Sequence, residues 1–172
     1  MEYYDYKDLT AYQTHCYEDM YKHYYQRYRW IAFIDVDEYI HLFNHKTIQE
    51  FVHQDKFNDA NMIYLHWRCF GDNEQVRFEA KPVYERFTEP VSMYWLVNDF
   101  PINSHIKAIV KTEGEYITFP TPHNPRFIGN HPTRIYNSAG KHIEKPQARL
   151  DDICWDDACI NHYCTLTIDE YL

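Results

Sequence analysis

The sequence lacks any apolar run that approaches the roughly 18 residues needed to cross a membrane. Its first residues, MEYYDYKD, lack the basic and apolar regions of a signal peptide. Positive charge is scarce, because 17 Lys and Arg stand against 26 Asp and Glu, for a formal net charge of -9. A nucleic-acid backbone would repel such a chain. We therefore expect a cytoplasmic protein with no transmembrane segment and no nucleic-acid partner.

Cysteine is present in an odd number and without a metal-binding pattern. The five cysteines show neither a CxxC motif nor paired zinc-finger spacing. This excludes an obvious disulfide framework and predicts no structural zinc site. We therefore expect free thiols, in a reducing compartment, at all five positions: Cys16, Cys69, Cys154, Cys159 and Cys164.

What the sequence does contain is enough apolar surface for one core. The 172 residues are 45% hydrophobic and 18% aromatic, with 17 tyrosines against 4 glycines. Tyrosine has an apolar face and a polar tip, which suits a sugar-binding wall and also suits half-buried packing. No internal repeat or low-complexity segment is visible. We expect a single domain over residues 1–172.

The apolar spacing of the first third predicts helix, strand, acidic turn and helix. Apolar residues recur at helical spacing from Leu9 to Tyr28, which predicts an amphipathic helix. The β-favouring run at 30–34 predicts a short strand covered on both faces. Thr47 with Glu50 forms a capping box, which predicts a helix at about 47–55.

The rest of the chain predicts more strands. Strands are expected at 62–70, at 106–110 with one buried face, at 116–119 and at 158–164. The proline-rich segment 119–132 predicts an irregular loop or lid. A second capping box, Thr167 with Glu170, predicts a helix that begins near the last residue.

Two aspartates, Asp35 and Asp37, follow the predicted strand at 30–34. Both carboxylates would lie near one point, where they repel each other unless a cation lies between them. Mg²⁺ or Mn²⁺ accepts such oxygen ligands and keeps positions for phosphate oxygens. Surface Asp-x-Asp pairs are common, but here the strand delivers an acidic cluster to the core boundary, which is costly without a metal or hydrogen bonds. The pattern favours a metal site.

The segment RWIAFIDVDEYI resembles the strand and acidic motif of inverting glycosyltransferases with the GT-A fold, in their bacterial-type family 2-like and family 92-like branch. Further segments resemble the same branch in order and rough spacing from about Arg29 to Leu172. They are HWRCFGDN, PVYERFT, HIKAIVK, the loop around His123 and INHYCTLTIDEYL. The resemblance implies an α/β, GT-A-like mixed sheet flanked by helices.

The activity implied by this resemblance is hexosyl transfer, with inversion, from a nucleotide-diphosphate donor that we expect to be a UDP-sugar. The acceptor would be a glycan of a polysaccharide, lipopolysaccharide or glycoprotein, and the enzyme would lie in the cytoplasm or at the membrane periphery. Asp35 and Asp37 would bind Mn²⁺ or Mg²⁺ and the donor diphosphate. A third metal ligand would be His123 or His162, between which the sequence does not decide.

An inverting transfer also needs a general base, for which a carboxylate is usual. Asp72, at a strand end after a glycine, and Glu85, in the matched Glu-Arg-Phe segment, are the candidates; Glu85 could instead form an ion pair with Arg86. Lys107 is expected to offset the donor diphosphate charge. Lys111 and Arg126 could act similarly, or all three cations could be solvated surface residues.

The related families place a strand, a helix and a second strand before the acidic strand, where they bind the base and ribose. Here 28 residues precede Arg29, and they read as one helix. The resemblance therefore implies an N-terminally truncated fold that, by itself, is inactive or self-associates.

Two other functions remain open on the residues alone. Asp151, Asp152, Asp156 and Asp157 could join Asp35 and Asp37 in a two-metal phosphoesterase, although no nucleophile motif or phosphate loop is visible. The aromatic residues could instead serve a non-catalytic carbohydrate-binding or assembly module.

Overall fold

The structure, a computed structural model, describes residues 12–112, 117–128, 133–144 and 150–171. Its α-helices are α1 (Tyr12–Tyr24), α2 (Ile48–Val52), α3 (Val83–Arg86) and α4 (Ile168–Tyr171), and its 3-10 helices are η1 (Asp55–Phe57), η2 (Ile102–Ser104) and η3 (Leu150–Asp152). Its strands are β1 (Trp30–Ala32), β2 (Glu38–Leu42), β3 (Met62–Cys69), β4 (Leu96–Val97), β5 (Phe100–Pro101), β6 (Ile106–Lys111), β7 (Ile117–Thr118), β8 (Arg126–Phe127), β9 (Ile135–Asn137), β10 (His142–Ile143) and β11 (Ala158–His162).

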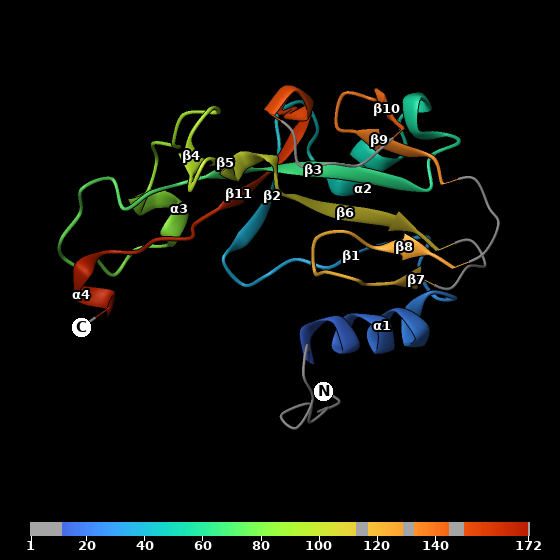
Figure 1. Ribbon diagram of the computed structural model, residues 1–172, viewed down its shortest axis with the longest axis horizontal. Coiled ribbons are helices and arrows are strands. Elements are labelled where there is room, and N and C mark those ends of the chain that lie inside the picture. Colours follow the sequence, from blue (N-terminus) through green and yellow to red (C-terminus); the bar gives the residue numbers. More distant parts are fainter. Residues whose placement is uncertain (1–11, 113–116, 129–132, 145–149, 172) are drawn as a thin grey trace.

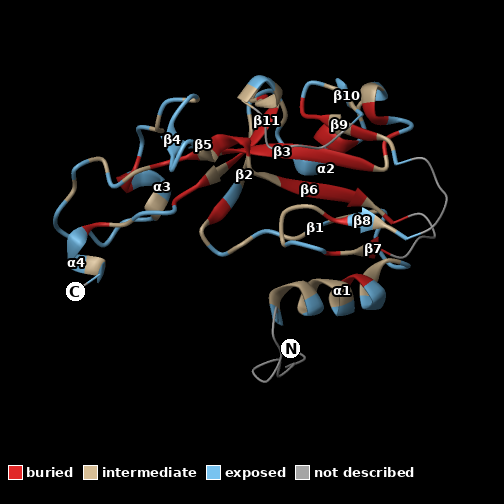
Figure 2. Cartoon of the chain, in the orientation of Figure 1, coloured by how far each residue is buried: buried red, intermediate tan, exposed pale blue. Residues whose placement is uncertain are grey.

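A mixed sheet of seven strands organises the fold (Figure 1). Its main path runs β1-β6-β3-β11-β2, while β9 pairs with β3 and β10 pairs with β9. Strand β3 is antiparallel to β6 but parallel to β11 and β9. The expected mixed α/β sheet is therefore present. In this sheet β3 is central, and Figure 2 shows that almost all of it is buried.

The two faces of β3 pack against different helices, because successive side chains of a strand point to opposite faces. Ile63 and Leu65 belong to a core with Phe51 of α2. Met62 and Tyr64 belong to a second core with Tyr21 of α1. Full burial of one such aliphatic or aromatic side chain contributes about 1.5–3 kcal/mol. The predicted strand at 62–70 is confirmed as β3.

Strand β1 differs from the expectation that both of its faces are covered. It pairs with β6 alone among the described strands, and its residues are half-buried or exposed. The side chains of this segment alternate: Phe33 stacks on Tyr17 of α1, with ring centroids 4.7 Å apart, whereas Val36 is 99% exposed. Ile31 and Phe33 pack against the core with Tyr21, and Trp30 packs against the other core. Ala32 and Ile34 are exposed, so the predicted continuous burial is wrong.

Strand β6 differs in the opposite direction. We expected one solvated face, but residues 107–110 are all buried because both faces of β6 are packed: Ile109 belongs to the core with Phe51, and Ala108 and Val110 belong to the core with Tyr21. The proline-rich segment is also more regular than expected, since Arg126 and Phe127 form β8 opposite β7. These two residues follow Pro125 and retain their backbone N–H groups, so the prolines do not prevent this short pairing.

Both predicted capping pairs are in contact, and each forms one of the two reciprocal hydrogen bonds of a capping box. The Thr47 Oγ1 accepts a hydrogen bond from the Glu50 N–H at 3.2 Å and begins α2, which is shorter than the predicted helix. The Glu170 carboxylate accepts hydrogen bonds from the N–H and hydroxyl of Thr167, at 3.1 and 2.6 Å.

The predicted strand at 158–164 is observed as β11. Two parts of the predicted elements lie outside the described ranges: the start of the predicted first helix, before Tyr12, and Tyr116 of the predicted strand at 116–119. In the described part, no helix has the length and apolar character needed to cross a membrane.

Candidate functional site

The acidic motif forms a tight turn between β1 and β2. The Glu38 N–H donates to the Asp35 carbonyl at 3.1 Å, and the Asp35 N–H donates to the Glu38 Oε2 at 2.9 Å. The motif therefore closes its own turn with backbone and carboxylate groups. The Glu38 carboxylate thus takes part in this closure, whereas the Asp35 and Asp37 side chains contact other segments of the chain.

Asp35 is held by three donors from two distant parts of the chain. Its Oδ1 accepts hydrogen bonds from the Gln13 Nε2 at 2.7 Å and the Tyr17 hydroxyl at 2.9 Å, both on α1. Its Oδ2 lies 2.9 Å from the Lys107 Nζ on β6. Burial raises the pKa of Asp35, but Lys107 and the Tyr17 hydroxyl outweigh burial, so the pKa lies below its ordinary value. Asp35 is therefore an anion in a fixed position.

Glu38 and Trp67 complete the buried side of this turn. The Glu38 Oε1 accepts a hydrogen bond from the Trp67 Nε1 at 2.8 Å, and its Oε2 lies 3.4 Å from the Lys107 Nζ. Burial raises the pKa of Glu38. The hydrogen bond from the Asp35 N–H and the charge of Lys107 partly offset this increase. Lys107 is 1% exposed, so two carboxylates compensate one buried ammonium.

Asp37 faces a histidine of β11. The His162 Nε2 lies 3.5 Å from the Asp37 Oδ2, and the Asp37 side chain is 45% exposed. The Tyr163 N–H donates to the Asp37 carbonyl at 3.0 Å, which fixes the turn against the end of β11. Burial lowers the pKa of His162, although Asp37 opposes this effect. Asp37 is thus the more accessible of the two aspartates.

His123 approaches the same group from the proline-rich loop. Its ring centroid lies 5.2 Å from that of Trp67 and 5.4 Å from that of His105. Burial and, next, the Lys107 charge lower its pKa to about 4. The His123 Nδ1 is buried and has no hydrogen-bond partner in the described part of the chain. A neutral imidazole with an unsatisfied ring nitrogen is the form that binds a metal.

The predicted donor-binding residues thus lie around one turn but do not converge on one point. In the described ranges, neither aspartate forms a compact three-ligand group with a histidine. The reason is that Asp35 is directed toward Lys107 while Asp37 is directed toward His162. An ionised carboxylate has about four lone-pair positions, and Asp35 uses three of them. Asp37, with its exposed carboxylate, therefore fits a divalent cation better than Asp35 does.

The predicted base candidates lie elsewhere. Asp72 is exposed after β3, where its Oδ1 accepts a hydrogen bond from the Glu74 N–H at 3.0 Å. Glu85 is exposed on α3, and its neighbour Arg86 forms its ion pair with Glu170 instead, at 2.8 Å. In the described residues, neither candidate has a side-chain hydrogen bond or ion pair with the aspartates of the turn.

Sequence reasoning did not assign a role to four residues that hold the turn, namely Gln13, Tyr17, Glu38 and Trp67. Gln13 and Tyr17 are four apart and therefore share one face of α1. That spacing alone could not identify them as partners of Asp35, because the sequence does not show that α1 packs against the acidic turn.

The other two predicted cations are placed differently from the buried Lys107. Lys111 lies over the Trp30 ring, at 5.9 Å, and Arg126 is exposed.

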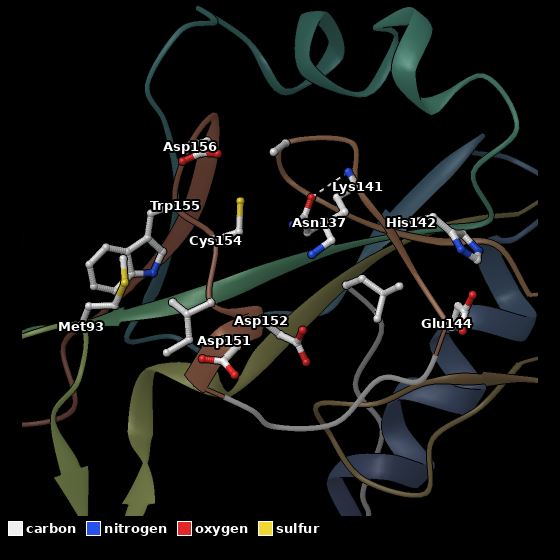
Figure 3. A pocket seen from close by; sticks show the side chains of 13 residues that line it. Met93, Asn137, Lys141, His142, Glu144, Asp151, Asp152, Cys154, Trp155 and Asp156 are labelled. Carbon is white, nitrogen blue, oxygen red and sulfur yellow. Dashed lines mark hydrogen bonds between the residues drawn. The ribbon is translucent and has the colours of Figure 1, made fainter.

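A cavity of about 590 Å³ lies apart from the turn and shares none of its residues (Figure 3). Asp151, Asp152 and Asp156 line it, but Figure 3 shows Asp156 well away from the other two. Asp157 is engaged by Lys56 and by the Asn44 amide, the latter at 2.8 Å. No carboxylate group suited to two metals is present in the described ranges, so the phosphoesterase alternative has no support from this arrangement.

A second cavity, of about 410 Å³, is lined mainly by aromatic residues and adjoins the Asp37 end of β2. It lies between β2, β11 and α3, and its wall includes Tyr39, Arg68, Tyr84, Phe87 and Tyr163. Tyr39 and Tyr84 are 41% and 55% exposed. The cavity therefore offers accessible aromatic faces, on the sheet face opposite the one that carries Glu38, Trp67 and His162.

The chain matches a known protein family. Residues 4–149 match the sequence model of glycosyltransferase family 92. The matched range contains Asp35, Asp37, Lys107 and His123, but it ends before His162. A comparison with curated proteins finds no match. Because the family match covers most of the sequence, the chain belongs to glycosyltransferase family 92.

Proposed function

We propose that this chain transfers a sugar from a nucleotide-diphosphate donor, expected to be a UDP-sugar, to a glycan acceptor with inversion at the anomeric carbon, on a GT-A-like fold. Family membership supports glycosyl transfer in general. The observation that carries the finer proposal is the turn in which Asp35 is fixed against buried Lys107 while Asp37 stays exposed. Fixed charges of both signs around one turn suit a metal-bound diphosphate.

A divalent cation, Mn²⁺ or Mg²⁺, would offset the charge that develops on the leaving diphosphate. Asp37 would hold this cation, and Asp35 would contribute its one remaining lone pair. The third protein ligand would be His123, with its unsatisfied Nδ1, or His162, whose Nε2 lies 3.5 Å from Asp37. Lys107 would keep Asp35 ionised and in place, and its charge would add to the field that attracts the diphosphate.

The acceptor would lie in the aromatic-lined cavity, whose wall residue Tyr39 is two positions from Asp37 in the chain, and it would reach Asp37 around the end of β2. Its aromatic faces suit the apolar faces of sugar rings, and Arg68 and Asn161 in its wall offer hydrogen-bond donors. An inverting step needs a carboxylate to accept the acceptor hydroxyl proton as that oxygen attacks the anomeric carbon and the bond to the diphosphate breaks. Glu85 and Asp72 are the candidates, and Glu85 lies in α3 between Tyr84 and Phe87 of the cavity wall.

A thermal melt tests donor binding without knowledge of the sugar or the acceptor. The protein would be melted alone, with Mn²⁺, with UDP, and with both. We expect a clear rise in the melting temperature with both together, and little change with either one, because ligand that binds the native state stabilises it. A glycan-only binding module would instead respond to oligosaccharide and not to Mn²⁺ with UDP.

Asp35→Asn tests whether Asp35 belongs to the donor site. Asp19→Asn, the same substitution at an exposed position of α1, is its control. Asp35→Asn is expected to lower the melting temperature of the free protein, so the ligand-induced shift is compared and not the absolute value. Loss of that shift in Asp35→Asn but not in Asp19→Asn supports the proposal. An equal shift in both variants would remove Asp35 from the donor site.

A further inference from the structure

Two cysteines and a histidine that are far apart in the sequence lie together where β3 and β11 end. Cys69 and His162 are direct cross-strand partners in the parallel β3–β11 pair. Cys164 follows His162 by two positions, so in extended chain both side chains point to the same face. The three side chains therefore share one small region of one sheet face.

The distances between these side chains match a tetrahedral metal site. The Cys69 Sγ lies 3.9 Å from the His162 Nδ1, and the ligand atoms of Cys69, His162 and Cys164 all lie within 4.8 Å of one another. Sulfur and nitrogen ligands of one tetrahedral Zn²⁺ are about 3.5 Å apart, given bond lengths of about 2.3 and 2.0 Å. In the described ranges, this is the only group of three potential ligands that is so compact.

The surroundings of His162 match those of a zinc-binding histidine. Its second nitrogen, Nε2, lies 3.5 Å from the Asp37 carboxylate. Such a carboxylate commonly accepts the free N–H of a histidine that binds zinc and fixes its tautomer. The Trp67 ring centroid lies 4.0 Å from that of His162 and limits the ring's rotation. Cys69 is buried, whereas Cys164 is exposed, so solvent can reach the metal position.

We infer that Cys69, Cys164 and the Nδ1 of His162 form a binding site for a thiophilic divalent cation, Zn²⁺. Binding releases the two thiol protons to solvent, and a water molecule completes four-coordination. His162 then donates from Nε2 to Asp37, which leaves Asp35, Asp37 and His123 for the diphosphate-bound cation. Spacing along the sequence gave no sign of a zinc site, because these three residues come together only through the pairing of β3 with β11. It does not depend on the proposed sugar transfer.

The test measures metal content and the spectrum of the cobalt form. The full chain would be purified with zinc, dialysed against buffer without metal, and analysed for zinc per chain. We expect one zinc per chain. Replacement by Co²⁺ should give the near-ultraviolet charge-transfer band of cobalt–thiolate bonds, which carboxylate or imidazole ligands alone do not produce.

Variants locate the site. Cys69→Ser and Cys164→Ser should each bind zinc at least 10-fold more weakly, and Asp37→Asn about 10-fold to 100-fold more weakly. Cys16→Ser, a half-buried thiol on α1, should bind zinc as the unchanged protein does. Circular dichroism of the metal-free variants confirms that they fold. Cys164 is exposed, so its serine variant should tolerate the change.

The inference fails if the unchanged protein holds no zinc, if its cobalt form lacks the charge-transfer band, or if Cys164→Ser binds zinc as tightly as Cys16→Ser does. It also fails if mass spectrometry of peptides from freshly purified protein shows a disulfide between Cys69 and Cys164. Donor binding by the same preparations is measured separately, so loss of the zinc site does not count against the proposed transferase.

Discussion

The Nζ of Lys107 lies 2.9 Å from the Oδ2 of Asp35, in an ion pair whose lysine side chain is 2% exposed and whose aspartate side chain is 33% exposed. The pair joins β6, in the interior of the sheet, to the turn that carries both aspartates. Its buried end is further compensated by Glu38, whose side chain is fully buried. The acidic turn therefore depends on one lysine from a strand 72 residues away.

Lys107→Met should destabilise the protein strongly, because it leaves the buried carboxylate of Glu38 and the fixed carboxylate of Asp35 without their cation. Removal of one partner of a buried ion pair typically costs about 3–5 kcal/mol. Urea denaturation measures the change in the free energy of unfolding. Lys81→Met, at an exposed pair with Glu79, is the control and should change little. Equal effects of the two substitutions would contradict the buried pair.

His66 should make the fold sensitive to mild acid. Burial lowers its pKa from 6.5 to about 4, so the folded state binds fewer protons than the unfolded state between these values. Stability is therefore fully present above about pH 6.5 and decreases as the pH falls toward 4, by up to about 3 kcal/mol from this residue.

His66→Leu should remove this part of the acid sensitivity, whereas His53→Leu, at an exposed position, should retain it. The measurement is the free energy of unfolding in urea at pH 7, 6 and 5. If His66→Leu loses as much stability between pH 7 and 5 as His53→Leu does, the assignment to His66 is wrong.

Arg86 and Glu170 should hold α4 against α3, since the guanidinium meets the carboxylate with two hydrogen bonds, at 2.8 and 3.0 Å. The hydrogen bond from Arg86 and, next, that from Thr167 lower the pKa of Glu170 to about 2. Glu170→Gln should therefore speed amide hydrogen exchange in Ile168–Tyr171, while Glu85→Gln should not. Faster exchange in Glu85→Gln alone would favour the Glu85–Arg86 pair that the sequence left open.

Local signals in the sequence predicted local structure well. The apolar run of β3 and the strand at β11 depend on neighbouring residues, and both are present in the structure. The two capping pairs are also local, and each forms one of its two reciprocal hydrogen bonds. The acidic segment DVDE was also visible in the sequence, and in the structure it forms the turn that leads from β1 into β2.

Features that depend on pairing between distant segments could not be predicted. Burial of Lys107 follows from packing on both faces of β6, which the alternating sequence of that strand does not specify. Cys69 and His162 meet only through the register of a parallel pair 93 residues apart. Glu38 was visible as part of the motif, but its partner Trp67 lies on another strand.

The central claim is that the exposed carboxylate of Asp37 binds a cation that in turn binds the donor diphosphate. Calorimetric titration of UDP into the protein with saturating Mn²⁺, and again with EDTA, tests this claim most directly for the unchanged protein and for Asp37→Asn. We predict binding only with Mn²⁺ and an affinity at least 10-fold weaker in Asp37→Asn, which is the order of loss seen when a metal site is altered. Equal affinity for UDP in the two proteins, or equal binding with EDTA, would contradict the claim.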